Sequence, residues 1–186
     1  MLIFTKMRKE LFQKIDIPEG IEVHIEGTSL TVKGREGENK KTFKIGKLDF
    51  EKKGNQIVIG SKTSTKKEKR LMNTLKSHVE NMIKGVQEKF EYKLKICFSH
   101  FPMTVSTQGD EVTIKNFLGE KISRKFKIPN GAKVEVGKDL VTITSTNKEL
   151  AGQAAANFEA STKVGKRDRR IFQDGIFIIN KAGKEI

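Results

Sequence analysis

Cysteine and tryptophan are nearly missing from this chain: Cys97 stands alone and there is no tryptophan. A single cysteine excludes a disulfide within the chain and suits a reducing compartment. No segment approaches the roughly 18 consecutive apolar residues that a membrane-spanning helix needs. The first residues also lack the apolar stretch and cleavage site of a signal peptide. These absences predict a cytoplasmic protein that does not interact with membranes.

Catalytic and metal-binding motifs are missing as well. The histidines His24, His78 and His100 are isolated, and Cys97 with His100 forms one C-x-x-H pair without the second pair that a zinc site needs. No phosphate-binding glycine loop, dinucleotide fingerprint or serine-hydrolase elbow occurs. We therefore expect no enzyme activity, no metal, no cofactor and no small-molecule substrate.

Positive charge is what the chain has in excess. It holds 37 Lys and Arg against 23 Asp and Glu, a formal net charge of +14, and its isoelectric point is near 9.8. A surface this cationic favours a polyanionic partner such as nucleic acid. The aromatic signature of an RNA-recognition-motif sheet is absent.

The sequence also contains an internal repeat. Residues that match at a spacing of 82 are the pairs Val23/Val105, Gly27/Gly109, Leu30/Val112, Lys33/Lys115 and Gly37/Gly119. After one inserted residue the spacing is 83, for Phe43/Phe126, Ile45/Ile128, Gly54/Gly137 and Val58/Val141. This period is far longer than the roughly 20–50 residues of solenoid and propeller repeats. We predict a tandem duplication of a small α+β domain, with boundaries at residues 1–88 and 89–186.

Each copy has the same order of elements. In the first, strands around residues 21–25, 30–33, 42–45 and 57–59 precede a helix that opens with a capping box at Thr65–Glu68 and ends near Gly85. In the second, strands at 103–107, 112–115, 121–128 and 140–143 precede a capping box at Thr146–Glu149 and a helix ending near Gly165.

Two further strands complete this prediction. Residues 90–98 alternate apolar and polar between the copies, and residues 171–179 form a closing strand. Each unit is expected to be a mostly antiparallel sheet with one helix packed on one face.

Three runs of basic residues are candidate binding surfaces, at 62–70, 121–127 and 163–170. Such runs often do no more than solvate an exposed face. The third departs most from that interpretation, because four of its five cations follow Gly165 in a stretch without periodicity that can fit a phosphate surface. Lys163 also lies at the negative end of the preceding helix dipole.

The segment Asn116–Lys121 forms the tip of a hairpin in the second copy. Phe117 and Leu118 look exposed by their position. They either pack locally or insert against RNA or a neighbouring protein.

Several longer motifs resemble a known family, the universal large-subunit ribosomal protein six in its archaeal and eukaryotic branch. The motifs that carry the resemblance are at residues 17–23, 32–37, 92–96, 99–105, 116–121, 152–157 and 167–176. One departure is Arg35-Glu36, where the family usually has Pro-Lys before Gly37.

The resemblance implies a non-catalytic protein of the cytoplasmic ribosome. It would bind large-subunit rRNA near the sarcin-ricin loop, at the base of the stalk, among neighbouring large-subunit proteins and close to translation factors. By motif match, RNA contact falls on second-unit residues, and mainly on the first five of these: Lys163, Lys166, Arg167, Arg169, Arg170, Asn116 and Lys121. Arg124 and Lys125, from the basic run 121–127, complete the candidate set. The alternative is a free-standing RNA-binding regulatory protein that uses the same basic surfaces.

Overall fold

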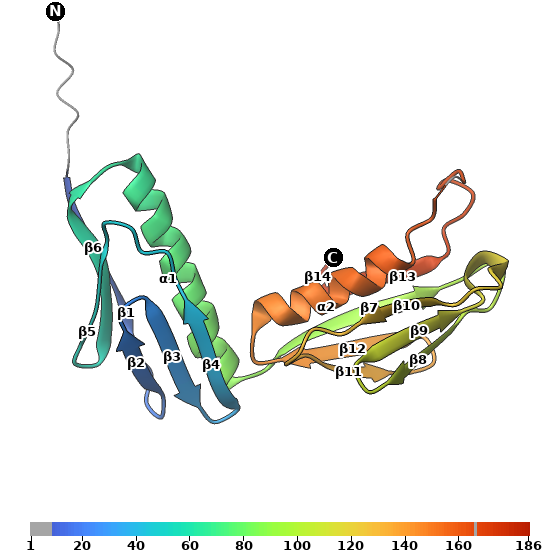
Figure 1. Ribbon diagram of the computed structural model, residues 1–186, viewed down its shortest axis with the longest axis horizontal. Helices are drawn as coiled ribbons and strands as arrows, with labels where there is room; N and C mark the ends of the chain where they lie inside the picture. The colour runs from blue at the N-terminus through green and yellow to red at the C-terminus, as the bar shows by residue number, and fades with distance from the viewer. Residues whose placement is uncertain (1–8, 166) are drawn as a thin grey trace, which may run out of the picture. The chain divides into compact units, whose positions relative to one another are not determined.

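The structure, a computed structural model, describes residues 9–165 and 167–186. The chain divides into two compact units, Met1–Glu88 and Lys89–Ile186 (Figure 1). Each unit has its own hydrophobic core. We therefore describe the two units separately.

Unit 1 combines two antiparallel sheets with one helix. The first sheet has the order β1 (Lys9–Asp16), β6 (Gln56–Ser64), β5 (Asp49–Lys53). The second has the order β2 (Glu22–Glu26), β3 (Ser29–Gly34), β4 (Gly37–Thr42). Helix α1 (Lys66–Gln87) packs against strands of both sheets.

Unit 2 repeats this plan and extends it. Its larger sheet has the order β11 (Lys133–Val136), β12 (Leu140–Ser145), β7 (Phe90–Cys97), β13 (Gly175–Lys181), β14 (Lys184–Glu185). The smaller sheet has the order β10 (Arg124–Lys127), β9 (Glu111–Lys115), β8 (Thr104–Gln108). Helix α2 (Lys148–Ser161) packs on β7, β10, β12 and β13, and η1 (Phe117–Gly119) is a single 3₁₀ turn.

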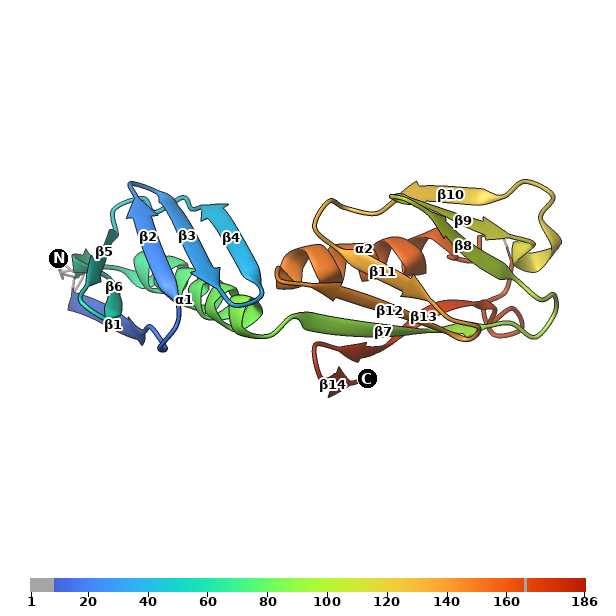
Figure 2. The same ribbon diagram turned by 90° about the horizontal axis from the view of Figure 1, so that it is seen from below.

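The two strand orders confirm the duplication. The order β5-β6-β1 in unit 1 matches β11-β12-β7 in unit 2, and β2-β3-β4 matches β8-β9-β10 (Figure 2). All strand pairs are antiparallel, and the described part of each unit holds one α-helix, as predicted. The expectation of one sheet per unit was wrong, because the strands of each unit divide over two sheets.

Turn chemistry explains why the first hairpin recurs. Gly27 and Gly109 adopt φ of 59° and 60°, a left-handed conformation that glycine enters without the steric cost of a Cβ. Each therefore reverses the chain in a short turn, which sets the pairing of Glu26 with Ser29 and of Gln108 with Glu111.

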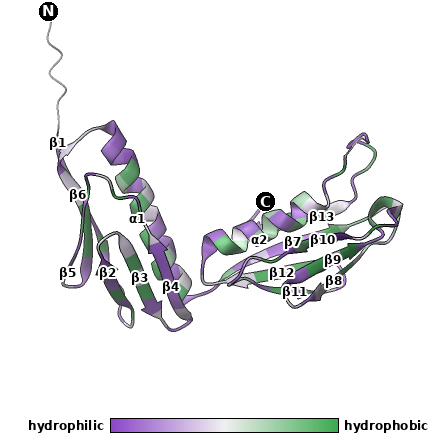
Figure 3. Cartoon of the chain, viewed as in Figure 1, coloured by the Kyte–Doolittle hydropathy of each residue, from purple (hydrophilic) through white to green (hydrophobic). Residues whose placement is uncertain are grey.

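Helix α1 begins as predicted and ends later. Thr65 and Glu68 form a reciprocal capping box that satisfies backbone N–H groups at its start. The helix carries both hydrophobic and hydrophilic residues along its length (Figure 3). Its buried stripe contains Met72, Leu75, Val79, Met82, Ile83, Gly85 and Val86, with Leu71 only partly buried. Gly85 is therefore a packing position inside the helix, which continues to Gln87.

Helix α2 departs further from the prediction. Its N-cap is Asn147, whose side chain accepts from the Glu149 N–H, so Thr146 does not open a capping box. The helix ends at Ser161 instead of near Gly165, because the buried Thr162 turns its backbone out of the helix. Its buried side chains are Ala151, Ala154, Ala155 and Phe158.

Two predicted strands also need correction. Residues 37–42 form β4, while Phe43 and Ile45 lie beyond its end as buried loop residues. The strand register therefore differs between the two units. Leu30 pairs with Lys41, whereas the corresponding Val112 pairs with Phe126, the counterpart of Phe43. Ile171 and Phe172 lie in a turn outside β13, since both of their N–H groups bond to the Asp168 carbonyl oxygen.

Candidate RNA-binding loop

The segment between α2 and β13, residues 162–174, is anchored at both ends. Thr162 Oγ1 donates to the Phe158 carbonyl oxygen at 3.2 Å and accepts from the Ile176 N–H at 2.9 Å. This hydroxyl therefore joins the end of α2 to the start of β13. The loop between these anchors contains the basic run 163–170.

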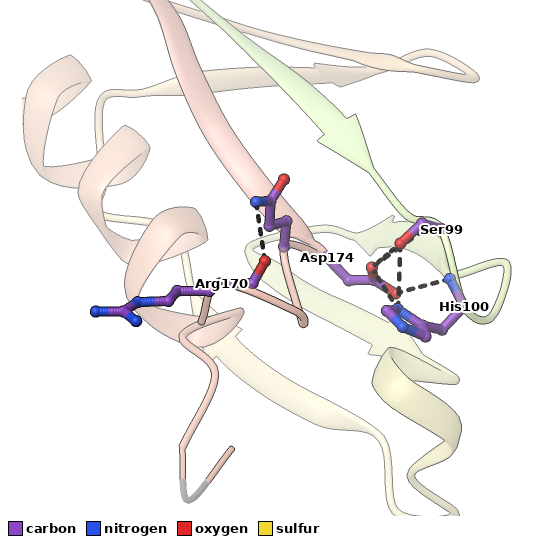
Figure 4. Close-up of polar contacts among 5 residues, drawn as sticks. Ser99, His100, Arg170 and Asp174 are labelled. Carbon is purple, nitrogen blue, oxygen red and sulfur yellow. Dashed lines mark hydrogen bonds and ion pairs between the residues drawn. The ribbon is translucent and has the colours of Figure 1, made fainter. Parts of the chain in front are cut away.

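The second anchor is the Asp174 carboxylate, which is 2% exposed. Ser99 donates to it through its N–H at 3.1 Å and its hydroxyl at 2.9 Å, and His100 through its N–H at 3.3 Å and Nδ1 at 3.1 Å (Figure 4). Burial opposes ionisation of this carboxyl, but the hydrogen bonds from His100 and Ser99 outweigh it and lower the pKa of Asp174 to about 2. Asp174 thus ties the loop to the end of β7 as a charged group.

Serine, histidine and aspartate meet here, but not as a catalytic triad. A triad needs the carboxylate on one imidazole nitrogen and the serine on the other. Here the Ser99 hydroxyl and the Asp174 carboxylate both contact Nδ1 of His100, at 3.1 Å each. The geometry positions a loop and cannot relay a proton from the serine. Among residues 9–165 and 167–186, no group of three metal-ligating side chains gathers either.

Inside the loop, the Asp168 side chain stabilises a backbone turn, and the neighbouring arginines are exposed to solvent. Asp168 Oδ1 accepts from the Arg170 N–H at 2.9 Å, which fixes a local turn. Arg167, Arg169 and Arg170 are exposed, and no ion pair joins them to Asp168 in the described part of the chain. The Arg167 guanidinium lies 4.8 Å from the ring centroid of Phe172.

Aromatic contacts support this geometry. The ring of Phe172 stacks on His100 with a centroid distance of 4.7 Å. Phe172 therefore links the arginine-bearing turn to the Asp174 cluster. Lys163 is exposed at the start of the loop, and Lys166 lies outside the described residues.

Arg124, one of the predicted RNA contacts, is engaged within unit 2. Its guanidinium donates to both carboxylate oxygens of Glu120, at 2.7 and 2.5 Å, and to the carbonyl oxygens of Ser161 at 2.7 Å and Lys163 at 3.3 Å. It also lies 4.3 Å from the Phe117 ring centroid. The hydrogen bond from Arg124 lowers the pKa of Glu120. Arg124 therefore caps the C-terminus of α2 and holds the start of the basic loop.

The remaining predicted RNA contacts, Asn116, Lys121 and Lys125, are not part of the loop. Asn116 is exposed, but its side chain donates to the Pro102 carbonyl oxygen at 2.9 Å. Lys121 is exposed, and Lys125 pairs with Glu111 at 3.3 Å.

The aromatic tip of this hairpin packs locally. Phe117 and Leu118 are 1% and 8% exposed, so they are buried and cannot insert into a partner.

The basic run 62–70 has no comparable frame. Lys66, Lys67 and Lys69 are exposed on the first turn of α1, a regular helix end.

No helix in the described chain is long and apolar enough to cross a membrane.

Comparison with known proteins gives this loop a context. The family model described as Ribosomal protein L6 matches residues 17–89 and 101–175, one match in each unit. The chain belongs to the ribosomal protein L6 family. It is 46% identical to the large ribosomal subunit protein uL6 of Methanobrevibacter smithii over 181 residues, covering 97% of this chain and 99% of that protein. It is 43% identical to uL6 of Methanococcus vannielii over 172 residues, covering 92% and 94%.

Membership of the L6 family agrees with the expectation of a non-enzymatic protein. Sequence reasoning found the exposed cations but missed the residues that hold them. Asp174 lies within the family motif at 167–176, but neither it nor Thr162 was identified as an anchor from the sequence. The internal hydrogen bonds of Arg124 were also missed, because a charge run does not reveal which cations point inward.

Proposed function

We propose that the protein is a structural component of the large subunit of the cytoplasmic ribosome, and that unit 2 binds the large-subunit rRNA. The observation that carries this proposal is the set of exposed arginines at 167, 169 and 170 on a loop anchored by Thr162 and Asp174. Family membership and the names of the two uL6 relatives support it.

The physical basis is phosphate binding on a preformed frame. Arginine matches phosphate geometry with paired N–H donors, and neutralising phosphates releases counterions. Since Asp168 and Asp174 already fix the loop, little conformational entropy is lost on binding. Folded rRNA presents phosphates in a defined shape, so specificity comes from fit and not from base sequence alone.

The location within the subunit is the finer part of the proposal. The motifs at 152–157 and 167–176 support a site near the sarcin-ricin loop, at the base of the stalk. Neighbouring large-subunit proteins would lie around it, and translation factors nearby. Chemical footprinting of large-subunit rRNA with and without the protein tests this location, and protection confined to another rRNA domain would contradict it.

A charge-removal series tests the binding surface. Replacing Arg167, Arg169 and Arg170 together by Gln should weaken binding to large-subunit rRNA strongly. It should also flatten the slope of log K against log salt by about 2–3 units, because each phosphate contact contributes about 0.7–0.9. The readout is rRNA affinity at a series of salt concentrations.

The matched control is a Gln triple variant at Lys66, Lys67 and Lys69, which removes the same charge from unit 1. Both variants should stay folded, since exposed substitutions usually change stability by about 0.5 kcal/mol or less. A larger loss of rRNA affinity in the unit 1 variant would show that the RNA-binding surface lies in unit 1 and not in unit 2.

The rival function is a free-standing RNA-binding regulator. A structural component should remain with large subunits through sedimentation in high salt, because its site is completed by the assembled particle. A regulator that binds mainly through phosphates should dissociate there.

A further inference from the structure

Unit 2 contains a groove of about 850 Å³ beside the basic loop. Its walls come from the ends of β7 and α2, the start of β13 and the loop residues 162–174. The volume lies within the roughly 300–1,000 Å³ that small-ligand sites usually have. The groove thus has room for a flat group of nucleobase size.

Aromatic rings and small side chains shape the groove. Phe98 and Phe177 line it while remaining 45% and 42% exposed. Ala156 and Ala160 of α2 also line it, and their single methyl groups leave the rings uncovered. The ring of Phe177 lies over the backbone of Gly175, where the absence of a Cβ leaves room for it. Two partly exposed rings in one groove form a surface for stacking.

Charge at the groove selects the kind of occupant. Lys163 and Arg169 line it and are exposed. Of the two lining carboxylates, Asp174 is buried and saturated by Ser99 and His100, which leaves Glu159 as the exposed acid. Aromatic faces with cations beside them bind an unstacked base and its phosphate, the usual arrangement for single-stranded nucleic acid.

We propose that this groove receives one unstacked nucleotide of the large-subunit rRNA. Its base lies against Phe98 and Phe177, and its phosphate is neutralised by Arg169 and Lys163. This inference rests on the rRNA-binding function proposed above and adds a base-binding site to a surface otherwise read as phosphate-binding.

Cys97 provides a reporter for the groove. It is the only cysteine of the chain, is partly exposed and lines the groove. Alkylation of the full-length protein by N-ethylmaleimide should slow at least tenfold when protein-free large-subunit rRNA of Methanobrevibacter smithii saturates it. Unchanged alkylation in the presence of bound rRNA overturns the proposal.

Aromatic substitutions complete the test. Phe177→Ala should weaken rRNA binding roughly 5- to 100-fold, the range for losing one base–aromatic stack, without changing the salt slope. Phe177→Leu, which keeps apolar bulk, should bind nearly as weakly. The control is Phe101→Ala, a ring 47% exposed in the same unit but outside the groove.

The two levels of inference fail differently. If wild-type protein does not bind rRNA at all, the proposed function is wrong. If it binds and Phe177→Ala and Phe177→Leu are neutral, the base site alone is wrong. Protection of Cys97 only in intact subunits, and not by free rRNA, would indicate a neighbouring protein in the groove and also overturns the proposal.

Discussion

The two units share one plan, yet only unit 2 carries the framed basic loop. Strand β1 of unit 1 and strand β7 of unit 2 occupy equivalent places in their sheets. In unit 2, β13 covers the second edge of β7, whereas the described residues of unit 1 supply no strand for that edge of β1. The loop, the groove and the Asp174 anchor all belong to this addition. The proposed binding features therefore lie with the elements that unit 2 adds to the shared plan.

The units also hold their helix C-termini by different means. In unit 1 the Val86 carbonyl oxygen accepts from the backbone N–H of Glu36 at 3.0 Å. In unit 2 the side chain of Arg124 takes this role at Ser161 and Lys163. The tip of the β3–β4 hairpin thus binds the helix C-terminus in unit 1, and the Arg124 guanidinium does so in unit 2. The connection between β9 and β10 in unit 2 is longer than that between β3 and β4.

The largest predicted effect concerns the two helix stripes. The buried stripe of α1 includes Met72, Leu75 and Val79, whereas the buried side chains of α2 are three alanines and Phe158. Because α2 relies on one large ring, Phe158→Ala should destabilise unit 2 by about 3–5 kcal/mol.

Denaturant unfolding measures that loss. Tyr92, the only tyrosine and part of the unit 2 core, provides a fluorescence signal for that unit. Val79→Ala in unit 1 should cost only about 2 kcal/mol, measured by hydrogen exchange of α1. Equal losses would show that the stripes are energetically alike.

The next effect separates the two ways of capping. Arg124→Ala should destabilise unit 2 by about 2–3 kcal/mol, since it removes hydrogen bonds to the Glu120 carboxylate and to α2 carbonyls. The pKa of Glu120 should rise at the same time, which NMR titration can follow. Arg124→Lys, with one point charge in place of a fork, should recover only part of the loss.

Unit 1 should be sensitive at its hairpin tip instead. A Cβ at Gly34 would lie 2.8 Å from Val86 Cγ2 and 2.9 Å from the Val86 carbonyl oxygen. Gly34→Ala should therefore push the tip from α1 and cost about 1–3 kcal/mol in unit 1 alone. Hydrogen exchange at the Glu36 amide should report the opening, and an unchanged exchange rate would contradict this account.

Acid should remove about 2 kcal/mol of stability from unit 2 through Asp174. The folded pKa of Asp174, about 2, lies below its ordinary value of 3.8, so the carboxylate stabilises unit 2 fully at neutral pH. This contribution should disappear as the pH falls from about 5 to 2. Asp174→Asn should abolish that part of the pH dependence, while Asp110→Asn, at an exposed carboxylate, should leave it intact.

The smallest effect is expected at Cys97. It lies on the less buried face of β7 with Lys93 and Lys95, opposite Tyr92 and Leu94. Cys97→Ser should change unit 2 stability by about 0.5 kcal/mol or less and leave rRNA affinity unchanged. A larger change in either quantity would mean that the thiol itself contributes to the groove.

Local patterns predicted the repeated parts of the fold well. Glycine turns, alternating strands and the Thr65–Glu68 capping box follow from neighbouring residues, and the structure confirms them. The end of α2 did not follow from sequence, because the Thr162 hydroxyl is satisfied by Ile176, a residue of another strand. The two-sheet division likewise depends on packing between distant segments.

The candidate site was predictable only as a list of charges. The exposure of Arg169 and Arg170 agrees with that list, while Arg124 turns inward to carbonyls about forty residues along the chain. The same arginine also lies over the Phe117 ring, 4.3 Å from its centroid. Whether a cation faces solvent or a helix end is set by tertiary contacts that no local spacing encodes.

The appended strand has a kinetic consequence. Ser99 and Asp174 meet across 75 residues of chain, whereas Asp16 and Gln56 in unit 1 meet across 40. Longer closure costs more chain entropy before contacts repay it, and slows folding. Unit 1 should therefore refold first, with β13 docking as a late step in unit 2. Until then the arginine loop has no frame, so the proposed function predicts that a refolding chain gains its rRNA affinity only when its last sheet contacts form.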